Sequence, residues 1–283
     1  MTDYGHPLRF GAFITPGAAD PARTVDLAVR AEDSGLDLVT FQDHPYQPAF
    51  LDTWTLLSYV AARTERVALS GNVLSLPLRQ PAVLARAAAS LDRLTGGRVE
   101  LGLGAGAFWD AIVAMGGTRR TPGESVSALE QAIEVIRGIW DVGDRTPLHA
   151  GGALVRVDGA KRGPAPAHRI PVVLGAYKPR MLRLTGATAD GWLPSAGYLG
   201  PGDLARGNAA IDAAARAAGR DPRAIVRALN ITPELGADDL VRLAVEEGVS
   251  TFILASDDPG RLDTFATAVA PIVRARVAER RAA

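Results

Sequence analysis

The sequence contains no cysteine and only three methionines among its 283 residues. Disulfide bonds, thiolate metal ligands and cysteine nucleophiles are therefore excluded. Histidine is scarce as well, with His6, His44, His149 and His168 as the four. Their spacing fits no zinc motif, so we expect no metal site. Any redox chemistry would have to come from a bound cofactor.

Long apolar runs and an excess of either charge are also missing. No apolar stretch approaches the roughly 20 residues that a membrane span needs. Lys and Arg number 31, as do Asp and Glu, which gives a formal net charge of zero. A neutral chain offers no electrostatic reason to bind nucleic acid or an anionic membrane. The first ten residues lack a basic-then-apolar signal pattern, and we expect a cytoplasmic protein.

A strand–helix–strand pattern near the middle of the chain is the clearest element signal. Residues 67–74 form an apolar strand candidate, and residues 81–94 form a helix candidate that begins with Pro81 and stops at two glycines. A second strand candidate ends in Gly104-Ala105-Gly106. Glycines directly after a strand let a planar or anionic ligand approach the backbone. We therefore expect a ligand site at the strand ends; a tight turn without a ligand is the alternative.

Similar units fill the whole chain. The eight strand candidates are 8–14, 36–41, 67–74, 99–103, 171–174, 190–193, 224–231 and 250–254, each followed by a helix candidate. With no linker or second composition regime, this predicts an α/β fold, a single (β/α)8 TIM barrel over residues 1–283. Residues 141–170, rich in Gly and Pro with a hairpin-like alternation, are interpreted as an excursion between the fourth helix and the fifth strand. A doubly wound open sheet is the alternative.

Active sites of such barrels lie at the carboxyl ends of the strands. Asp43-His44, after the second strand, is the pair with the most chemistry, because histidine titrates near neutrality and can donate or accept a proton. A structural histidine satisfied by backbone is the alternative. Gly175 and Lys178, at a helix start, could hold a phosphate through backbone N–H groups and a cation, or could simply be exposed. No Walker A loop, complete GxGxxG or GxSxG motif is present.

Several segments, in order, are similar to the bacterial luciferase-like group of flavin- and deazaflavin-dependent oxidoreductases. They include FGAFITP, FQDHPYQP, the long run from TWTLLSYV to VELGLGAG, and IPVVLGAYKPRMLRLTGATADGWLPS. The resemblance covers nearly the whole chain. It implies a (β/α)8 barrel with an isoalloxazine or deazaflavin ring bound at the mouth formed by the carboxyl ends of the strands.

The resemblance also assigns residues to the cofactor. It implies a bulge with a non-prolyl cis peptide behind the ring, and that position falls on Asn72-Val73. The other cofactor contacts that it implies are Gly104, Ala105 and Gly106 in the glycine turn, Gly175, Ala176, Tyr177 and Lys178 after the fifth strand, and Ser195. The glycine turn therefore has two independent reasons to belong to the site.

The resemblance favours coenzyme F420 over FMN as the cofactor. FMN enzymes of the group tend to show Glu-His-His after the second strand, whereas deazaflavin enzymes show Asp-His, as Asp43-His44 does here. The deazaflavin sugar-phosphate dehydrogenases place a glutamate directly after the glycine turn, where this chain has Ala107, and this disfavours sugar oxidation. With F420 we expect hydride transfer to a small organic substrate such as an imine, enone or enol. With FMN we expect a monooxygenase that needs a partner reductase.

Within this hypothesis His44 is the catalytic proton donor or acceptor and Asp43 orients it. Phe108, Trp109 and Tyr198 are expected to wall the substrate pocket. A non-catalytic flavin-binding barrel and a sugar-phosphate enzyme without a redox cofactor are the rivals. We also expect a homo-oligomer, and a flavin or F420 reductase as a possible partner. The sequence identifies neither the substrate nor the place of the 141–170 excursion.

Overall fold

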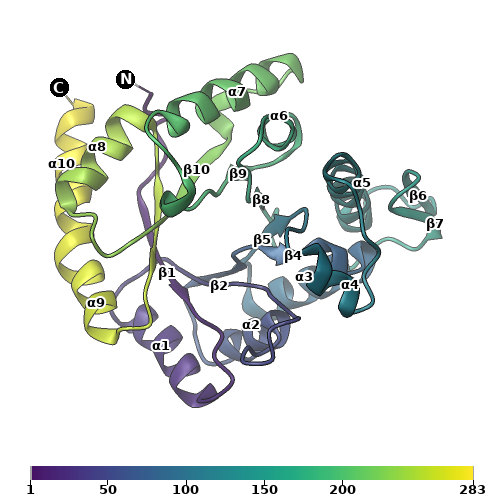
Figure 1. Cartoon of the computed structure of the whole chain (residues 1–283), viewed down its shortest axis with the longest axis horizontal. Helices are drawn as coiled ribbons and strands as arrows, with labels where there is room; N and C mark the ends of the chain where they lie inside the picture. Colours follow the sequence, from purple (N-terminus) through teal and green to yellow (C-terminus); the bar gives the residue numbers. More distant parts are fainter. Residues whose placement is uncertain (1, 283) are drawn as a thin grey trace.

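A closed barrel of parallel strands forms the centre of the computed structural model, which describes residues 2–282 (Figure 1). The strands are β1 (Arg9–Ile14), β2 (Leu38–Phe41), β3 (Ala68–Gly71), β4 (Leu74–Ser75), β5 (Val99–Gly104), β8 (Val172–Leu174), β9 (Gly191–Trp192), β10 (Val226–Ile231) and β11 (Thr251–Ala255). Their order is β3-β2-β1-β11-β10-β9-β8-β5-β4, and a β3–β5 pairing closes the ring. Because β3 and β4 are two halves of one strand, the (β/α)8 barrel is confirmed and the open sheet is excluded.

Helices surround the barrel on the outside. They are α1 (Pro21–Asp33), α2 (Thr53–Ala61), α3 (Pro81–Thr95), α4 (Trp109–Ala114), α5 (Pro122–Trp140), α6 (Pro179–Thr188), α7 (Asp203–Ala217), α8 (Ala237–Glu247), α9 (Pro259–Thr264) and α10 (Ala270–Ala282). Three short 3-10 turns, η1 (Leu76–Leu78), η2 (Ala196–Tyr198) and η3 (Pro222–Ala224), lie in the loops. A π-helical stretch, Phe265–Val269, joins α9 to α10.

Side-chain caps begin several of the helices. The Asp20 carboxylate accepts a hydrogen bond from the Arg23 backbone N–H at 3.0 Å, and Asp52 does the same for Thr55 at 2.9 Å. Thr121 and Glu124 form a reciprocal capping box at the start of α5. Each cap satisfies backbone N–H groups that have no partner inside the helix. The caps therefore fix where each helix leaves its strand-end loop.

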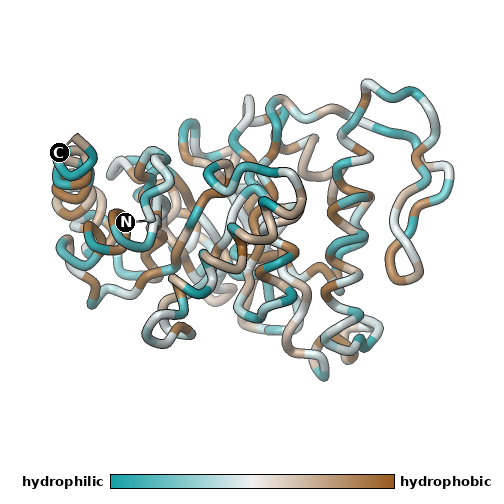
Figure 2. The backbone as a smooth tube through the Cα atoms, turned by 90° about the horizontal axis from the view of Figure 1, so that it is seen from above, coloured by the Kyte–Doolittle hydropathy of each residue, from teal (hydrophilic) through white to brown (hydrophobic). Residues whose placement is uncertain are grey.

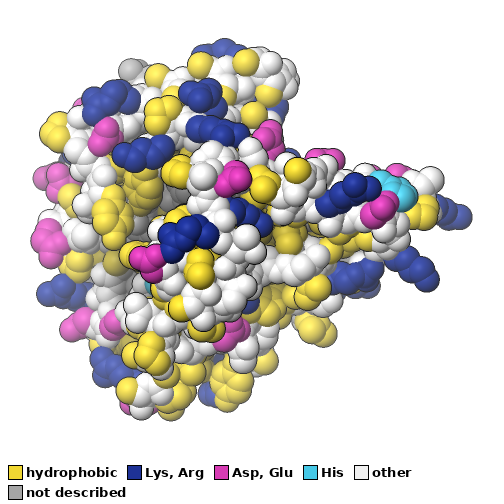
Figure 3. All heavy atoms as spheres, turned by 45° about the vertical axis from the view of Figure 1, so that its right-hand side comes forward, with side chains coloured by type: hydrophobic (Ala, Val, Ile, Leu, Met, Phe, Trp, Pro, Cys, Tyr) yellow, Lys and Arg dark blue, Asp and Glu magenta, His cyan; other side chains and the backbone are white. Residues whose placement is uncertain are grey.

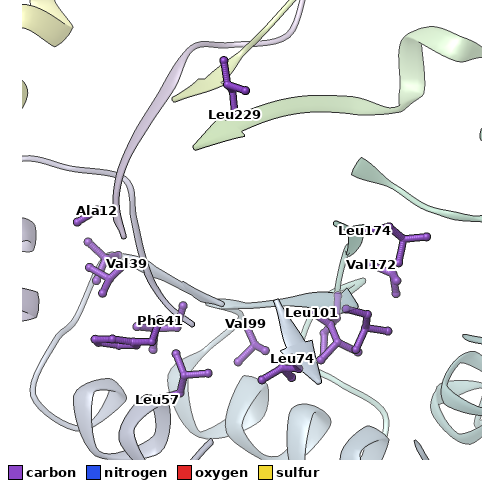
Figure 4. Close-up of a cluster of buried hydrophobic side chains, with 14 of the residues drawn as sticks. Ala12, Val39, Phe41, Leu57, Leu74, Val99, Leu101, Val172, Leu174 and Leu229 are labelled. Carbon is purple, nitrogen blue, oxygen red and sulfur yellow. The ribbon is translucent and has the colours of Figure 1, made fainter. Parts of the chain in front are cut away.

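The main hydrophobic core lies between the barrel wall and the helices. Phe41 on β2, Leu57 on α2 and Leu74 on β4 are almost completely buried, and Figure 4 shows them between strand and helix layers. Parallel strands covered by helices are buried on both faces, which explains their continuous apolar runs. Most of the buried apolar side chains thus lie around the barrel wall. The loops at the strand ends contribute less to this core and can carry polar groups.

The third barrel strand is interrupted where the resemblance placed a bulge. The Asn72–Val73 peptide bond is cis and separates β3 from β4. β3 pairs with β2 and β5, whereas β4 pairs with β5 only. The expected cis peptide at this bond is confirmed, and the prediction of one continuous strand over residues 67–74 is wrong.

The 141–170 excursion contains the expected hairpin, formed by β6 (Leu148–Gly151) and β7 (Arg156–Ala160). It packs along the outer side of α5, where the Gln131 side-chain oxygen accepts hydrogen bonds from the Leu154 and Val155 backbone at 3.0 and 2.9 Å. Figures 1 and 2 show it projecting sideways from the barrel, and charged side chains cover the projection in Figure 3. The excursion therefore lies outside α5, and its residues 154–156 line a hollow together with the loop that follows β4.

Candidate active site at the barrel mouth

The predicted site residues meet at one end of the barrel because all barrel strands run parallel. His44 follows β2, the Asn72-Val73 pair lies between β3 and β4, and the glycine turn ends β5. Gly175 to Lys178 follow β8, and Ser195 follows β9. We call this end the barrel mouth.

A polar network joins opposite sides of the barrel mouth. The side-chain amides of Asn72 and Asn230 donate to each other's oxygens at 2.7 and 2.9 Å. Asn72 also donates to the Thr40 hydroxyl at 3.1 Å, and Asn230 donates to the Ser195 hydroxyl oxygen at 2.9 Å. Sequence reasoning missed Asn230; its signal was an amide among the apolar residues at the carboxyl end of β10. The network therefore holds Ser195 in a fixed position relative to Asn72, the residue at which β3 and β4 are separated.

The Val73 side chain occupies the space that two glycines leave. A Cβ atom at Gly104 would lie 2.8 Å from Val73 Cγ2, and one at Gly175 would lie 3.1 Å from it. Gly106 has a φ of +95°, and a Cβ there would approach Pro77 to 2.6 Å. The sequence suggested that these glycines expose backbone to a ring. The structure adds that Gly104 and Gly175 are needed to seat Val73.

The Asp43 carboxylate binds Arg79 and the Ser75 backbone and not the ring of its neighbour His44. This carboxylate is 1% exposed and accepts hydrogen bonds from Arg79 Nε and Nη2 at 2.8 and 2.7 Å and from the Ser75 backbone at 2.8 Å. No hydrogen bond between Asp43 and His44 exists within residues 2–282, so the expectation that Asp43 orients His44 directly is wrong. Asp43 instead ties the β2 loop to β4 through Arg79.

Arg79 is held by two carboxylates. Besides Asp43, it donates to the Asp52 carboxylate at 2.8 Å, and Asp52 also caps α2. Burial alone would lower the pKa of Arg79, but its hydrogen bonds and attraction to Asp43 and Asp52 raise it above the ordinary value. The guanidinium therefore stays charged and its donors are committed to the protein.

His44 stands at the mouth with one ring nitrogen available. Its Nδ1 lies 2.7 Å from the Tyr46 hydroxyl, which leaves Nε2 for a ligand. Its ring is 5.6 Å from that of Phe108 and 6.4 Å from that of Phe50, centre to centre. Burial lowers the pKa of His44 below its ordinary value, and the negative charge of Asp43 offsets this only in part. The imidazole is therefore neutral near pH 7.

The opposite rim is formed by the loops after β8 and β9. The Ser195 backbone N–H donates to the Tyr177 hydroxyl at 2.8 Å, and the Tyr177 and Tyr198 rings meet edge to face at 5.8 Å. Lys178 is exposed at the start of α6, and its side chain makes no ion pair with the described part of the chain. Ala176, in contrast, is buried, and its carbonyl accepts from Trp192 Nε1 at 2.8 Å. Its side chain therefore belongs to the core.

A hollow of about 560 Å³ lies at the same end of the barrel, beside β1, β2 and β11. Gln42, two residues before His44, lines it together with Thr15, Ser256 and Arg261. This hollow was not predicted from the sequence. Over residues 2–282 no group of three or more His, Asp or Glu side chains is arranged to hold a metal ion. Within the same range no helix is both long and apolar enough to cross a membrane.

The fold and the site together define a (β/α)8 barrel protein with its candidate site at the carboxyl ends of the strands. The sequence pattern of the luciferase-like monooxygenase family matches residues 3–278, and the chain belongs to that family. The curated relatives include an F420-dependent glucose-6-phosphate dehydrogenase of Nakamurella multipartita, 34% identical over 68% of this chain. Another is a phthiodiolone/phenolphthiodiolone dimycocerosates ketoreductase of a Mycobacterium species, 34% identical over 76% of this chain. The alignments span 57% of the length of each of these two relatives.

The solved structures agree on the fold. An F420-dependent secondary alcohol dehydrogenase, determined with an F420–acetone adduct, superimposes with a TM-score of 0.83. The superposition covers 95% of this chain and 99% of that one, at 20% sequence identity. At this identity the likeness shows the fold and no more.

Proposed function

We propose that the protein is an oxidoreductase that binds a flavin-type cofactor, coenzyme F420, at the barrel mouth and reduces a small organic substrate there. The observation that carries this proposal is His44, whose free Nε2 lies at the same strand ends as Val73 and Ser195. An FMN-dependent monooxygenase with a partner reductase is the second candidate. The description of the family as luciferase-like monooxygenases favours it.

The residues at the mouth suit a flavin-type ring. Val73, seated between Gly104 and Gly175, offers an apolar wall. The Ser195 oxygen accepts from Asn230, and the bonds formed within residues 2–282 leave the Ser195 proton for a ring heteroatom. Lys178 and Tyr177 on the exposed rim suit the anionic tail of such a cofactor. The bound cofactor would give or take a hydride.

His44 would move the proton that accompanies the hydride. When a carbonyl or enone is reduced, Nε2 of a protonated His44 would donate to the substrate oxygen or carbon. In the reverse direction the neutral ring would accept the hydroxyl proton. Tyr46, bonded to Nδ1, fixes the ring orientation in both cases. The lowered pKa of His44 favours the accepting role at neutral pH.

The relatives support F420 over FMN and hydride transfer over oxygenation. One curated relative is an F420-dependent dehydrogenase and another is a ketoreductase, each 34% identical to this chain in the aligned region. Ala107 after the glycine turn remains the reason to doubt sugar-phosphate oxidation. We also retain as proposals a homo-oligomeric state and a reductase that recharges the cofactor.

The test is a turnover assay with both reduced cofactors. We expect ketones or enones to oxidise reduced F420 anaerobically, and reduced FMN to give no substrate-dependent O2 uptake. His44→Asn should lower turnover by about 10²-fold or more while cofactor binding persists. His149→Asn on the remote hairpin is the matched control and should behave like the parent protein. Full turnover of His44→Asn would refute its role, and inactivity with both cofactors would refute the proposed redox function.

A further inference from the structure

Exposed aromatic side chains are concentrated at the barrel mouth. Within residues 2–282, four aromatic side chains count as exposed, and three of them, Phe108, Tyr177 and Tyr198, lie on strand-end loops. Phe108 is 58% exposed and Tyr198 is 80% exposed. The fourth, Tyr59, lies on α2 and away from the mouth. Only 6% of the residues are aromatic, yet three of these four exposed rings lie at the barrel mouth. Exposed apolar side chains gathered in one place mark a surface that binds an apolar group.

Phe108 belongs to a cluster around His44. Its ring meets His44 edge-on at 5.6 Å and Tyr46 at 6.0 Å, and Phe50 completes the cluster at 6.4 Å from His44. Despite these contacts, the Phe108 side chain stays exposed to solvent. An aromatic group on a ligand would meet rings in offset or edge-to-face geometry there.

Arg79, which contacts the β2 loop that carries His44, is already paired. It is bound by Asp43 and Asp52, and its side chain is 14% exposed. Its guanidinium is therefore not available for a phosphate or carboxylate of a ligand beside His44. An ion in this place would lose hydration without gaining a partner.

The adjacent hollow beside β11 is also balanced in charge. It contains Arg23 and Arg261, but Asp257 and Asp258 line it too. Arg23 donates to the Asp257 backbone carbonyl at 3.1 Å. The hollow therefore offers hydrogen bonds to a polar group without an excess of positive charge.

We propose that the substrate of this site is an uncharged molecule with a planar apolar part, an aryl or conjugated ring system, joined to a single carbonyl or hydroxyl group. The ring lies against Phe108 and the oxygen meets His44 Nε2. The inference deepens the proposed function and rests on it for the chemistry. It distinguishes this chain from enzymes that act on sugar phosphates.

A calorimetric titration of the full chain tests the substrate class with and without F420. The ligands are benzylideneacetone, 3-penten-2-one, which has a methyl group in place of the phenyl, and glucose 6-phosphate. Enones are usable because the chain has no cysteine thiol to alkylate. We expect benzylideneacetone to bind about tenfold or more tightly than 3-penten-2-one, since the phenyl group is buried on binding. Equal affinities for the two enones, or tighter binding of glucose 6-phosphate, would overturn the proposal.

Two matched variants locate the contact. Phe108→Ala should weaken benzylideneacetone binding by about tenfold and leave 3-penten-2-one and F420 binding unchanged. Tyr59→Ala, with an equally exposed ring at 57%, should change none of the three affinities. A loss of F420 affinity in Phe108→Ala with benzylideneacetone affinity intact would assign the ring to the cofactor and overturn the proposal. Failure of the parent protein to bind F420 or FMN would instead contradict the proposed function, and the enone comparison would still decide the substrate class.

Discussion

Asp43 and His44 are neighbours in sequence but have different surroundings and separate tasks. Asp43 is buried and bound by Arg79 and Ser75, whereas His44 faces the mouth and pairs with Tyr46. The residue types and their place after a strand were readable from the sequence. Their partners were not, because Asp43 and Arg79 lie 36 positions apart. The Asn72–Asn230 pair, 158 positions apart, was hidden for the same reason.

The protonation of His44 should give opposite pH dependences in the two reaction directions. Because burial lowers its pKa below 6.5, the ring is neutral above that pH and becomes charged as the pH falls through the lowered value. Alcohol oxidation should therefore decline on this acid limb, while carbonyl reduction should rise. Steady-state profiles of kcat/KM in both directions measure this. His44→Asn should remove both limbs, and parallel limbs in the two directions would contradict the assignment.

The Arg79–Asp43 pair should matter far more than a surface ion pair. Arg79→Met leaves the Asp43 carboxylate buried without its charge partner and should cost about 3 to 5 kcal/mol of unfolding free energy. Arg276→Met breaks the exposed pair with Asp238 and should cost less than about 1 kcal/mol. Urea unfolding of both variants provides the comparison. Similar small losses would show that the Arg79 pair is not a structural anchor of the mouth.

At the scale of elements, the alternation of strands and helices was predictable from the sequence. For the third strand, the resemblance predicted the bulge at Asn72-Val73, but the apolar pattern alone did not predict the division into β3 and β4. Apolar runs located every barrel strand, since burial on both faces leaves a plain signal. The run over residues 67–74 was predicted as one strand because apolar residues resume at Val73, although Gly71 and Asn72 interrupt the apolar pattern. The short β9 (Gly191–Trp192) was expected to be longer, because strand ends depend on neighbours that the sequence does not show.

Gly104 and Val73 should behave as one coupled unit. A Cβ at Gly104 would press on Val73, so Gly104→Ala should destabilise the protein by about 1 to 3 kcal/mol and weaken cofactor binding. Adding Val73→Ala should restore part of the stability, which a double-mutant cycle measures. Gly197→Ala is the control, since nothing lies within 4 Å of a Cβ there. Additive effects of the two substitutions would contradict the packing argument.

For the whole molecule, the closed barrel explains why residues from five separate loops reach one site. The opposite end carries its own cluster, in which Arg227 is bound by Asp212 and lies over the Tyr4 ring at 4.3 Å. His6 lies in the same terminal segment, and its Nε2 is buried without a hydrogen-bond partner in the described structure. This end is held by packing and ion pairs and has no predicted role in chemistry.

Global stability should fall in mildly acidic solution because of His6. Burial lowers the pKa of His6 below 6.5, so the unfolded chain takes up the proton first. The contribution of His6 is fully present above the unfolded pKa and is lost as the pH falls through the lowered value. Denaturant midpoints at about pH 7.5 and about pH 5.5, roughly one unit either side of the ordinary His pKa, measure it. His6→Gln should flatten this slope, and an unchanged slope would exclude His6 as its source.

The central claim is that the barrel mouth binds a flavin-type cofactor of the F420 kind. The most direct measurement is a pair of fluorescence titrations of the full chain, one with F420 and one with FMN. We predict saturable binding of F420 that is about tenfold or more tighter than that of FMN. Ser195→Ala should weaken binding of F420. Saturable binding of neither cofactor would contradict the claim, and tighter binding of FMN would replace F420 hydride transfer by the monooxygenase alternative.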